Sequence, residues 1–296
     1  MAESPRTPWI PFTFLALPPE RTSVDSAHVV LIPVPYDSTT SYKGGAREGP
    51  RAIIEASHQL EEYDLELDTE VCKVGIHTAP WLEAHVGSPE AMVQRVREAV
   101  SGFARRGKLV GVLGGEHTVT IGAVQGMKEA YPDLSVLYLD AHADLREEYM
   151  GTRWGHASVA RRVYEICPLI QVGVRSLSLE EMRFIRQRGL PCFTWTGREE
   201  QVPYDEVLAH LSRNVYVSVD VDVLDPSLMA AVGTPEPGGM SWPVLLSILK
   251  AVARERRIVG FDVSELCPPE GPESCAYVAA KLVYKLIGYA TSEVRG

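Results

Sequence analysis

The sequence predicts an α/β protein in which helices cover both faces of a parallel sheet of about eight strands. Short apolar runs alternate with segments of helical periodicity along nearly the whole chain. Several of these runs end in acidic residues or histidine, as happens when the carboxyl ends of parallel strands build a site. No linker, internal repeat or low-complexity tract interrupts the alternation, so we expect one domain over residues 1–296.

The predicted strands are largely apolar, because a strand that helices bury on both faces shows little alternation with polar residues. They cover residues 28–34, 71–76, 108–113, 134–139, 169–174, 191–195, 216–220 and 258–263. The predicted helices cover residues 51–59, 89–105, 119–131, 157–166, 179–188, 204–211, 242–253 and 276–290. Pro50 suits the first turn of the first helix. The proline-rich residues 1–26 are predicted to form an extended arm that lies on the body or on a neighbouring subunit.

Composition excludes several classes of protein. The chain is 45% hydrophobic and 23% charged, which is typical of an ordered globular protein. A net charge of −10 without a basic stripe argues against nucleic-acid binding and is compatible with a cationic substrate. No segment has the length of a membrane span or the pattern of a signal peptide. Five scattered cysteines favour a reducing compartment, so we expect a cytoplasmic protein that does not bind membranes.

The chemistry is concentrated after the apolar run at 134–139, where Asp140, His142 and Asp144 follow one another at every second position. Residues two apart on an extended chain project to the same side. Clustered carboxylates repel one another, and burial increases the repulsion, so a bound cation is the simplest explanation. The alternative is a solvated loop in which the spacing is accidental.

The pattern recurs, which favours a metal site. Further acids or histidines end other apolar runs, and the complete set of candidate ligands is His117, Asp140, His142, Asp144, Asp220 and Asp222. Six such ligands are too many for one catalytic zinc and suit two divalent ions that share carboxylates. An oxygen-rich set without thiolate favours Mn²⁺.

Three segments resemble the signatures of the ureohydrolase superfamily, which includes arginase and agmatinase. They are Gly114-Gly115-Glu116-His117, Asp140-Ala141-His142-Ala143-Asp144, and the stretch from Ser218 to Pro226. Ser264-Glu265 and the stretch from Gly45 to Ile53 are also similar to that family. The resemblance implies a three-layer α/β/α arginase-like fold, two Mn²⁺ ions per subunit, and hydrolysis of a guanidino compound to urea and an amine.

The resemblance also implies a role for each position. One ion would bind His117, Asp140, Asp144 and Asp220, and the other Asp140, His142, Asp220 and Asp222. Asp144 would orient the attacking hydroxide and Glu265 would pair with the guanidinium, a charge-assisted contact. His156 would bind substrate and carry a proton to the leaving amine, although a histidine at a helix start can also simply cap or pack. Asp225 is predicted to fix a turn, and the sequence leaves the role of Glu116 open.

Two departures weigh against arginine as the substrate. The loop at 145–155 lacks the asparagines by which arginases recognise an amino acid, and Ser176 follows Gly173-Val174-Arg175 where arginases carry an acid. The loop offers Glu147, Glu148 and Trp154 instead, which suit a cationic amine tail. The alternative is that its glutamates form a solvated surface.

The resulting prediction is hydrolysis of agmatine, a small cationic guanidino substrate, to putrescine and urea. N1-aminopropylagmatine is the second choice, and guanidinobutyrate or formiminoglutamate follows because each carries a carboxylate. Two other classes stay open: a catalytically silent interaction subunit and a two-metal phosphoesterase. Family members form trimers or hexamers, so the resemblance implies a homotrimer or homohexamer.

Overall fold

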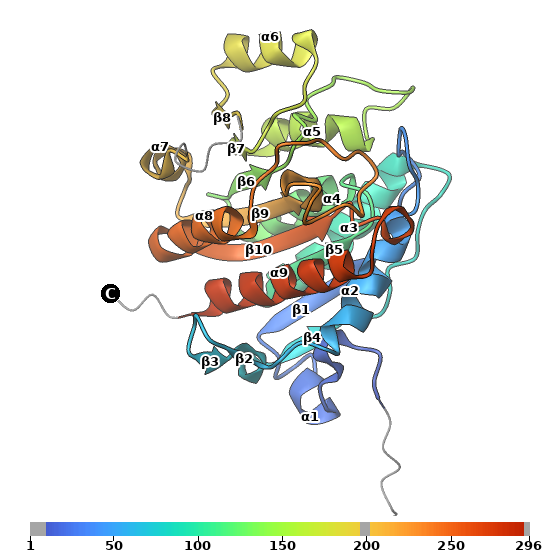
Figure 1. Cartoon of the computed structure of the whole chain (residues 1–296), viewed down its shortest axis with the longest axis vertical. Helices are drawn as coiled ribbons and strands as arrows, with labels where there is room; N and C mark the ends of the chain where they lie inside the picture. Colours follow the sequence, from blue (N-terminus) through green and yellow to red (C-terminus); the bar gives the residue numbers. More distant parts are fainter. Residues whose placement is uncertain (1–9, 196–201, 293–296) are drawn as a thin grey trace, which may run out of the picture.

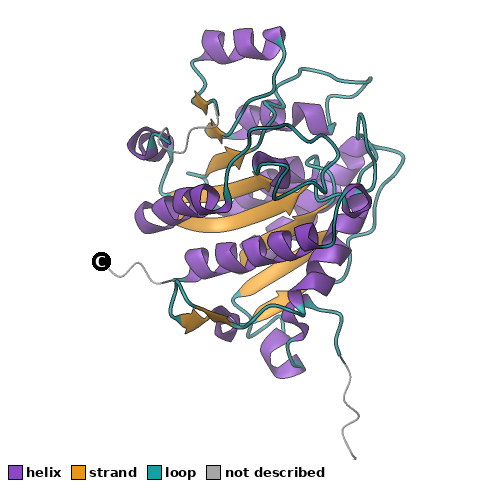
Figure 2. Ribbon diagram, in the orientation of Figure 1, coloured by secondary structure: helices purple, strands orange, loops and turns teal. Residues whose placement is uncertain are grey.

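An eight-stranded parallel sheet forms the centre of the computed structural model, which describes residues 10–195 and 202–292 (Figures 1 and 2). The strand order is β4-β1-β5-β10-β9-β6-β7-β8. These strands are β1 (Val29–Val34), β4 (Ile76–Thr78), β5 (Leu109–Gly114), β6 (Ser135–Leu139), β7 (Leu169–Val172), β8 (Cys192–Phe193), β9 (Asn214–Asp220) and β10 (Arg257–Ser264). Every residue of β1, β5 and β6 is buried, as expected for strands covered on both faces.

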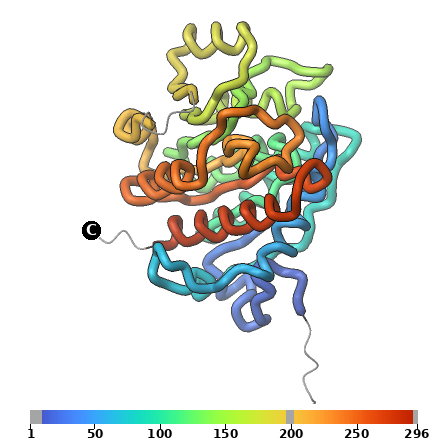
Figure 3. Tube along the Cα trace, viewed as in Figure 1, coloured from blue at the N-terminus to red at the C-terminus, as the bar shows by residue number. Residues whose placement is uncertain are grey.

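Helices cover both faces of the sheet and enclose two hydrophobic clusters. One cluster includes side chains of α2 (Gly49–Ser57), α7 (Tyr204–His210), α8 (Trp242–Glu255) and α9 (Ser274–Thr291). The other includes side chains of α3 (Pro89–Ala104), α4 (Val119–Ala130), α5 (Val159–Ile166) and α6 (Leu179–Arg188). Figure 3 shows α2 beside α9, although they lie far apart in the sequence. No described helix is long and apolar enough to cross a bilayer.

Local sequence signals explain where several helices begin and end. The Ser88 side chain accepts a hydrogen bond from the Ala91 amide at the start of α3. At α6, Ser178 and Glu181 form a capping box, and Gly189 ends the helix in the left-handed conformation. These caps satisfy amide and carbonyl groups that have no partner inside the helix.

The strand predicted at residues 71–76 is wrong. Residues Val71–Val74 form a 3₁₀ helix, Gly75 turns the chain with a φ of 76°, and β4 begins only at Ile76. Val71 and Cys72 are buried, so the apolar pattern correctly indicated burial. A short apolar run does not distinguish a strand from a helical turn.

Residues of the N-terminal arm are buried in the hydrophobic core, whereas the sequence predicted only that the arm lies on the surface of the body or of a neighbouring subunit. Phe14 and Leu17 are buried in the core, and the chain there forms a 3₁₀ turn (Phe14–Ala16) and the short helix α1 (Pro19–Thr22). The arm is therefore not extended throughout, because its aromatic and aliphatic side chains are drawn into the core; residues 1–9 lie outside the described part. A small hairpin of β2 (Tyr63–Asp64) and β3 (Thr69–Glu70) was not predicted.

Candidate functional site

The candidate site lies at the carboxyl ends of four neighbouring strands in the middle of the sheet, in the order β5-β10-β9-β6. His117 follows β5, Asp140 follows β6, Asp220 ends β9 and Glu265 follows β10. In parallel sheets the loops at this edge form the ligand-binding crevice. The sheet topology thus brings together side chains that are up to 148 residues apart in the sequence.

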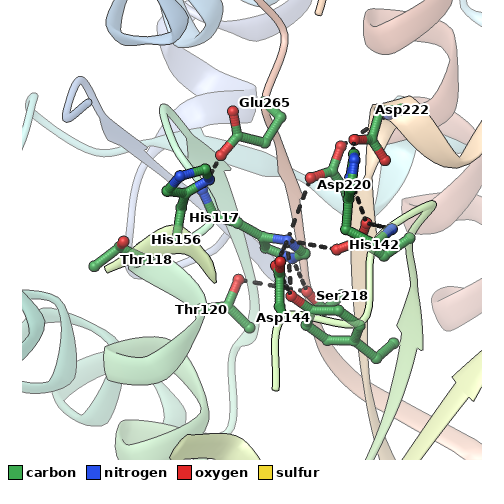
Figure 4. A network of polar contacts seen from close by, with 12 residues as sticks. His117, Thr118, Thr120, His142, Asp144, His156, Ser218, Asp220, Asp222 and Glu265 are labelled. Carbon is green, nitrogen blue, oxygen red and sulfur yellow. Dashed lines mark hydrogen bonds and ion pairs between the residues drawn. The ribbon is translucent and has the colours of Figure 1, made fainter. Parts of the chain in front are cut away.

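Two clusters of potential metal ligands meet at one shared residue. His117, Asp140 and Asp220 form the first, and Asp140, His142 and Asp222 form the second. In the first, His117 Nδ1 lies 3.1 Å from Asp140 Oδ2 and 3.3 Å from Asp220 Oδ2. In the second, His142 Nδ1 lies 2.9 Å from Asp222 Oδ2 and 3.6 Å from Asp140 Oδ1. Figure 4 shows His142, Asp220 and Asp222 grouped on one side of His117.

The electrostatics of these clusters fit bound cations. Burial and the neighbouring charges of Asp222 and Asp140 raise the pKa of Asp220 well above its usual value. Burial favours a neutral His117, yet the carboxylates around it raise the pKa of its imidazole. Asp140 Oδ2 is buried and accepts no hydrogen bond from the described residues. A buried carboxylate oxygen without a donor is costly, and a divalent cation would satisfy it.

Asp144 and Glu265 share an unusual backbone conformation. Both have positive φ angles, 49° and 66° respectively, which residues other than glycine rarely adopt. Asp144 Oδ2 accepts a hydrogen bond from Tyr138 Oη at 2.8 Å and lies 3.6 Å from His117 Nδ1. Glu265 Oε1 accepts a hydrogen bond from the His117 amide at 2.7 Å. Backbone strain of this kind concentrates at functional sites.

Tyr138, Ser218 and Asp262, which were not among the predicted site residues, hold the His117 ring in place. Tyr138 stacks on the imidazole with 4.6 Å between ring centres. His117 Nε2 lies 2.8 Å from Ser218 Oγ, which donates to Asp262 Oδ1 at 3.0 Å. Asp262 is fully buried and interrupts an apolar strand, a signal that could have identified it. Nδ1 faces the carboxylates and also lies 2.9 Å from Tyr138 Oη.

A cleft of about 300 Å³ opens above the clusters. His142, Asp144, Asp220 and Glu265 lie on its lining, as does His156 at the start of a 3₁₀ turn (His156–Ser158). Burial lowers the pKa of His156, and the positive charges of His142 and His117 act in the same direction. The cleft therefore combines metal-competent carboxylates with an imidazole whose neutral form is favoured by burial.

A model of the arginase family matches residues 27–288. The chain belongs to the arginase family. It is 44% identical over 272 residues to the N(1)-aminopropylagmatine ureohydrolase of Thermus thermophilus, covering 90% of this chain and 92% of that protein. It is 34% identical over 285 residues to the agmatinase of Pyrococcus horikoshii, covering 94% and 98%. The solved agmatine ureohydrolase of Thermoplasma volcanium matches with a TM-score of 0.82 and 31% identity, covering 91% and 92%.

Membership of the arginase family confirms the resemblance predicted from the signatures at His117, Asp140 and Asp220. The eight-stranded parallel sheet with helices on both faces confirms the arginase-like fold. The names of the relatives confirm the prediction of an enzyme of the ureohydrolase type.

Glu147, Glu148 and Trp154, which were predicted to bind substrate, lie in the loop beside the cleft. The described lining of the cleft does not include them. Glu147 instead pairs with Arg153 and with two arginines of α5, Arg161 at 2.7 Å and Arg162 at 3.3 Å. Its charge is therefore neutralised by residues whose proximity the sequence did not reveal.

Glu148 and Trp154 have different surroundings from Glu147. Glu148 is exposed, and Trp154 packs half-buried against the core. Arg146 and Tyr149 of the same loop line the cleft. The Arg146 guanidinium lies 4.7 Å from the centre of the Tyr149 ring. Glu181 of α6 also lines the cleft and was not predicted.

Arg175 ties the loop that carries Asp222 to the rest of this arginase-family fold. Its guanidinium donates to the carbonyl oxygens of Asp222 and Glu236, both at 2.7 Å, and of Val223 at 3.2 Å. Asp225, predicted to fix a turn, accepts hydrogen bonds from the Ser227 and Gly239 amides. Both side chains hold the segment that follows β9.

We expect Arg175→Ala to lower the free energy of unfolding by about 2–4 kcal/mol, because several charge-assisted hydrogen bonds are lost and their carbonyl acceptors stay inside the protein. Urea denaturation, comparing midpoint and slope, measures the effect. Arg183→Ala is the control, since Arg183 is exposed on α6 and its loss should change stability by less than about 0.5 kcal/mol. Equal losses in the two variants would contradict the role given to Arg175.

Proposed function

We propose that this chain hydrolyses N1-aminopropylagmatine to urea and the corresponding triamine. The observation that supports hydrolysis of a guanidine is the pair of metal-competent clusters that share Asp140 beneath a cleft. The order of identities supports the extended substrate, with 44% to an N(1)-aminopropylagmatine ureohydrolase and 34% to an agmatinase. The sequence alone favours agmatine, whereas the relatives favour N1-aminopropylagmatine, the second choice from the sequence.

We propose that two Mn²⁺ ions occupy these clusters. His117, Asp140, Asp144 and Asp220 would hold one ion, and Asp140, His142, Asp220 and Asp222 the other. The unpaired Asp140 oxygen and the oxygen-rich donor set fit such ions. When bound, a metal pair lowers the pKa of water so that hydroxide is available near neutral pH, which a resonance-stabilised guanidinium requires.

The chain's own residues position the substrate and move the proton. Glu265 pairs with the guanidinium nitrogens; burial, aided by the charge of Glu116, raises its pKa to about 8, and a bound cation favours its ionised form. Asp144 orients the nucleophile by a hydrogen bond. His156 passes a proton to the leaving amine, and its lowered pKa keeps it neutral and ready to accept that proton at pH 7.

The decisive experiment measures urea released from N1-aminopropylagmatine, agmatine, arginine and guanidinobutyrate with added Mn²⁺. We expect kcat/KM for N1-aminopropylagmatine to exceed that for agmatine by at least about tenfold, which corresponds to roughly 1.4 kcal/mol. A higher kcat/KM for agmatine than for N1-aminopropylagmatine would contradict this proposal and support agmatine, the substrate first predicted from the sequence. No urea from any guanidine by protein that holds two ions per chain would contradict the proposal and favour a silent subunit. Turnover of a phosphate ester would favour a phosphoesterase.

We also propose that the chain forms one domain and assembles as a homotrimer or homohexamer. The support is the resemblance to ureohydrolases. Light scattering coupled to size-exclusion chromatography tests the assembly, and a monomer at working concentration would contradict it.

A further inference from the structure

Glu116 is a fully buried acid to which the proposed reaction assigns no role. Its two carboxylate oxygens accept hydrogen bonds from one residue of a distant loop: Oε1 from Thr39 Oγ1 at 2.6 Å and Oε2 from the Thr39 amide at 2.7 Å. Burying a carboxylate is costly unless hydrogen bonds compensate for the lost water. Two of the compensating hydrogen bonds come from Thr39 and a further one comes from the Thr118 side chain, so the contact with Glu116 fixes Thr39 in place.

Thr39, which Glu116 holds in place, also forms a hydrogen bond with His156. Because a carboxylate only accepts, the Thr39 hydroxyl donates its proton to Glu116 and keeps its lone pairs for other donors. The backbone amide of His156 donates to Thr39 Oγ1 at 3.0 Å. Ser41, two residues further along the same loop, places Oγ 3.1 Å from His156 Nε2. One loop therefore holds both the backbone and the ring of His156.

The loop itself is fixed at its base. Asp37 is buried, accepts hydrogen bonds from the Gly45 amide at 2.8 Å and the Arg47 amide at 3.2 Å, and forms an ion pair with the Arg47 side chain. On the other side the loop approaches Gly155 closely, since a Cβ atom there would lie 3.3 Å from Thr39 Oγ1. Thr39 has little room to move away from the residue that precedes His156.

We propose that Thr39, anchored by Glu116, is a positioning residue that holds the His156 imidazole over the reacting end of the cleft. The inference rests on the proposed function, because it assigns the contact to proton transfer by His156. Thr39 contacts neither substrate nor metal ligand in this scheme and acts only through His156.

The first test is Thr39→Val, which removes the hydroxyl while keeping a similar shape. We expect kcat for urea release to fall about tenfold, with KM within twofold and metal content unchanged. Thr39→Ser should restore kcat to within twofold of the wild type. Thr40→Val is the matched control in the same loop, because the Thr40 hydroxyl contacts the Asp37 carbonyl instead, and it should leave kcat unchanged. Equal losses in the Thr39→Val and Thr40→Val variants would overturn the proposal.

A double-mutant cycle separates positioning from general damage. If Thr39 acts through His156, adding Thr39→Val to a His156→Ala enzyme causes no further loss of kcat. A further tenfold loss in that background would overturn the proposal.

A third measurement does not depend on activity. Amide hydrogen exchange at His156 should become at least about tenfold faster in Thr39→Val and stay unchanged in Thr40→Val. Unchanged exchange in Thr39→Val would overturn the positioning role. If the wild type releases no urea from any guanidine, the proposed function fails, while this exchange rate still decides whether Thr39 holds His156.

Discussion

Asp140→Asn should remove both metal ions and lower urea release at least about 1000-fold. Asp140 is the residue common to the two clusters, with Oδ2 beside His117 and Oδ1 beside His142. Asparagine has almost the same shape, but it carries no charge and turns one acceptor into a donor that faces the cations. A thousandfold loss corresponds to roughly 4 kcal/mol of transition-state stabilisation, a reasonable value for a metal pair that generates the nucleophile.

Metal content per chain, measured by plasma mass spectrometry, and a urea assay together check this expectation. Asp133→Asn is the control, because Asp133 is exposed just before the opposite end of β6 and pairs only with Asn214 in the described contacts. An Asp140→Asn protein that keeps two ions and full activity would refute the ligand scheme.

The second large effect is expected for His156→Ala. Removing a general acid–base residue lowers turnover by about 10²–10⁴-fold, so kcat should fall into this range while two ions stay bound. Burial lowers the pKa of His156 below its usual 6.5, so the neutral form predominates at pH 7 and is lost as pH falls through that lowered pKa. The wild-type kcat should therefore decline in acid below pH 6.5, and the variant should lose this limb.

The pH profile of kcat and the metal content distinguish this result from misfolding. His210→Ala is the control, since His210 is exposed at the end of α7. Unchanged turnover in His156→Ala would refute the proton-shuttle role, and loss of the metal ions would mean that His156 supports the metal centre.

The convergence of the metal-competent residues was predictable from the sequence. Asp140 and His142 follow one apolar strand and Asp220 ends another, and the carboxyl ends of parallel strands meet at one edge of a sheet. The central strands were predictable for the same reason, since β1, β5 and β6 are buried apolar runs, whereas the edge strands β4 and β8 are short and only partly buried. The strand predicted at residues 71–76 was wrong because an apolar run can also form a buried 3₁₀ turn. Here the turn ends at Gly75, which has a positive φ.

Contacts between distant segments could not be predicted. The neutralisation of Glu147 depends on Arg161 and Arg162, which approach it only after α5 has packed. The contact between Thr39 and His156 joins residues 117 positions apart. Neither segment has a residue pattern that indicates this contact. Local patterns report which face of an element is buried, and they do not report which charges meet across the fold.

The order of the central strands has a consequence for how the protein is made. β10 follows every other described strand in the sequence, yet it lies between β5 and β9, so the middle of the sheet closes only after segments far apart in the sequence have met. Such long-range pairing is slow, because closing the intervening loops costs conformational entropy before the new contacts can compensate for it. A nascent or truncated chain that lacks β9 has no Asp220 or Asp222 and cannot complete either ligand cluster. In the proposed ligand scheme, metal ions would therefore bind only after β9 has joined the sheet, and they would stabilise the folded chain by binding it in preference to the unfolded chain.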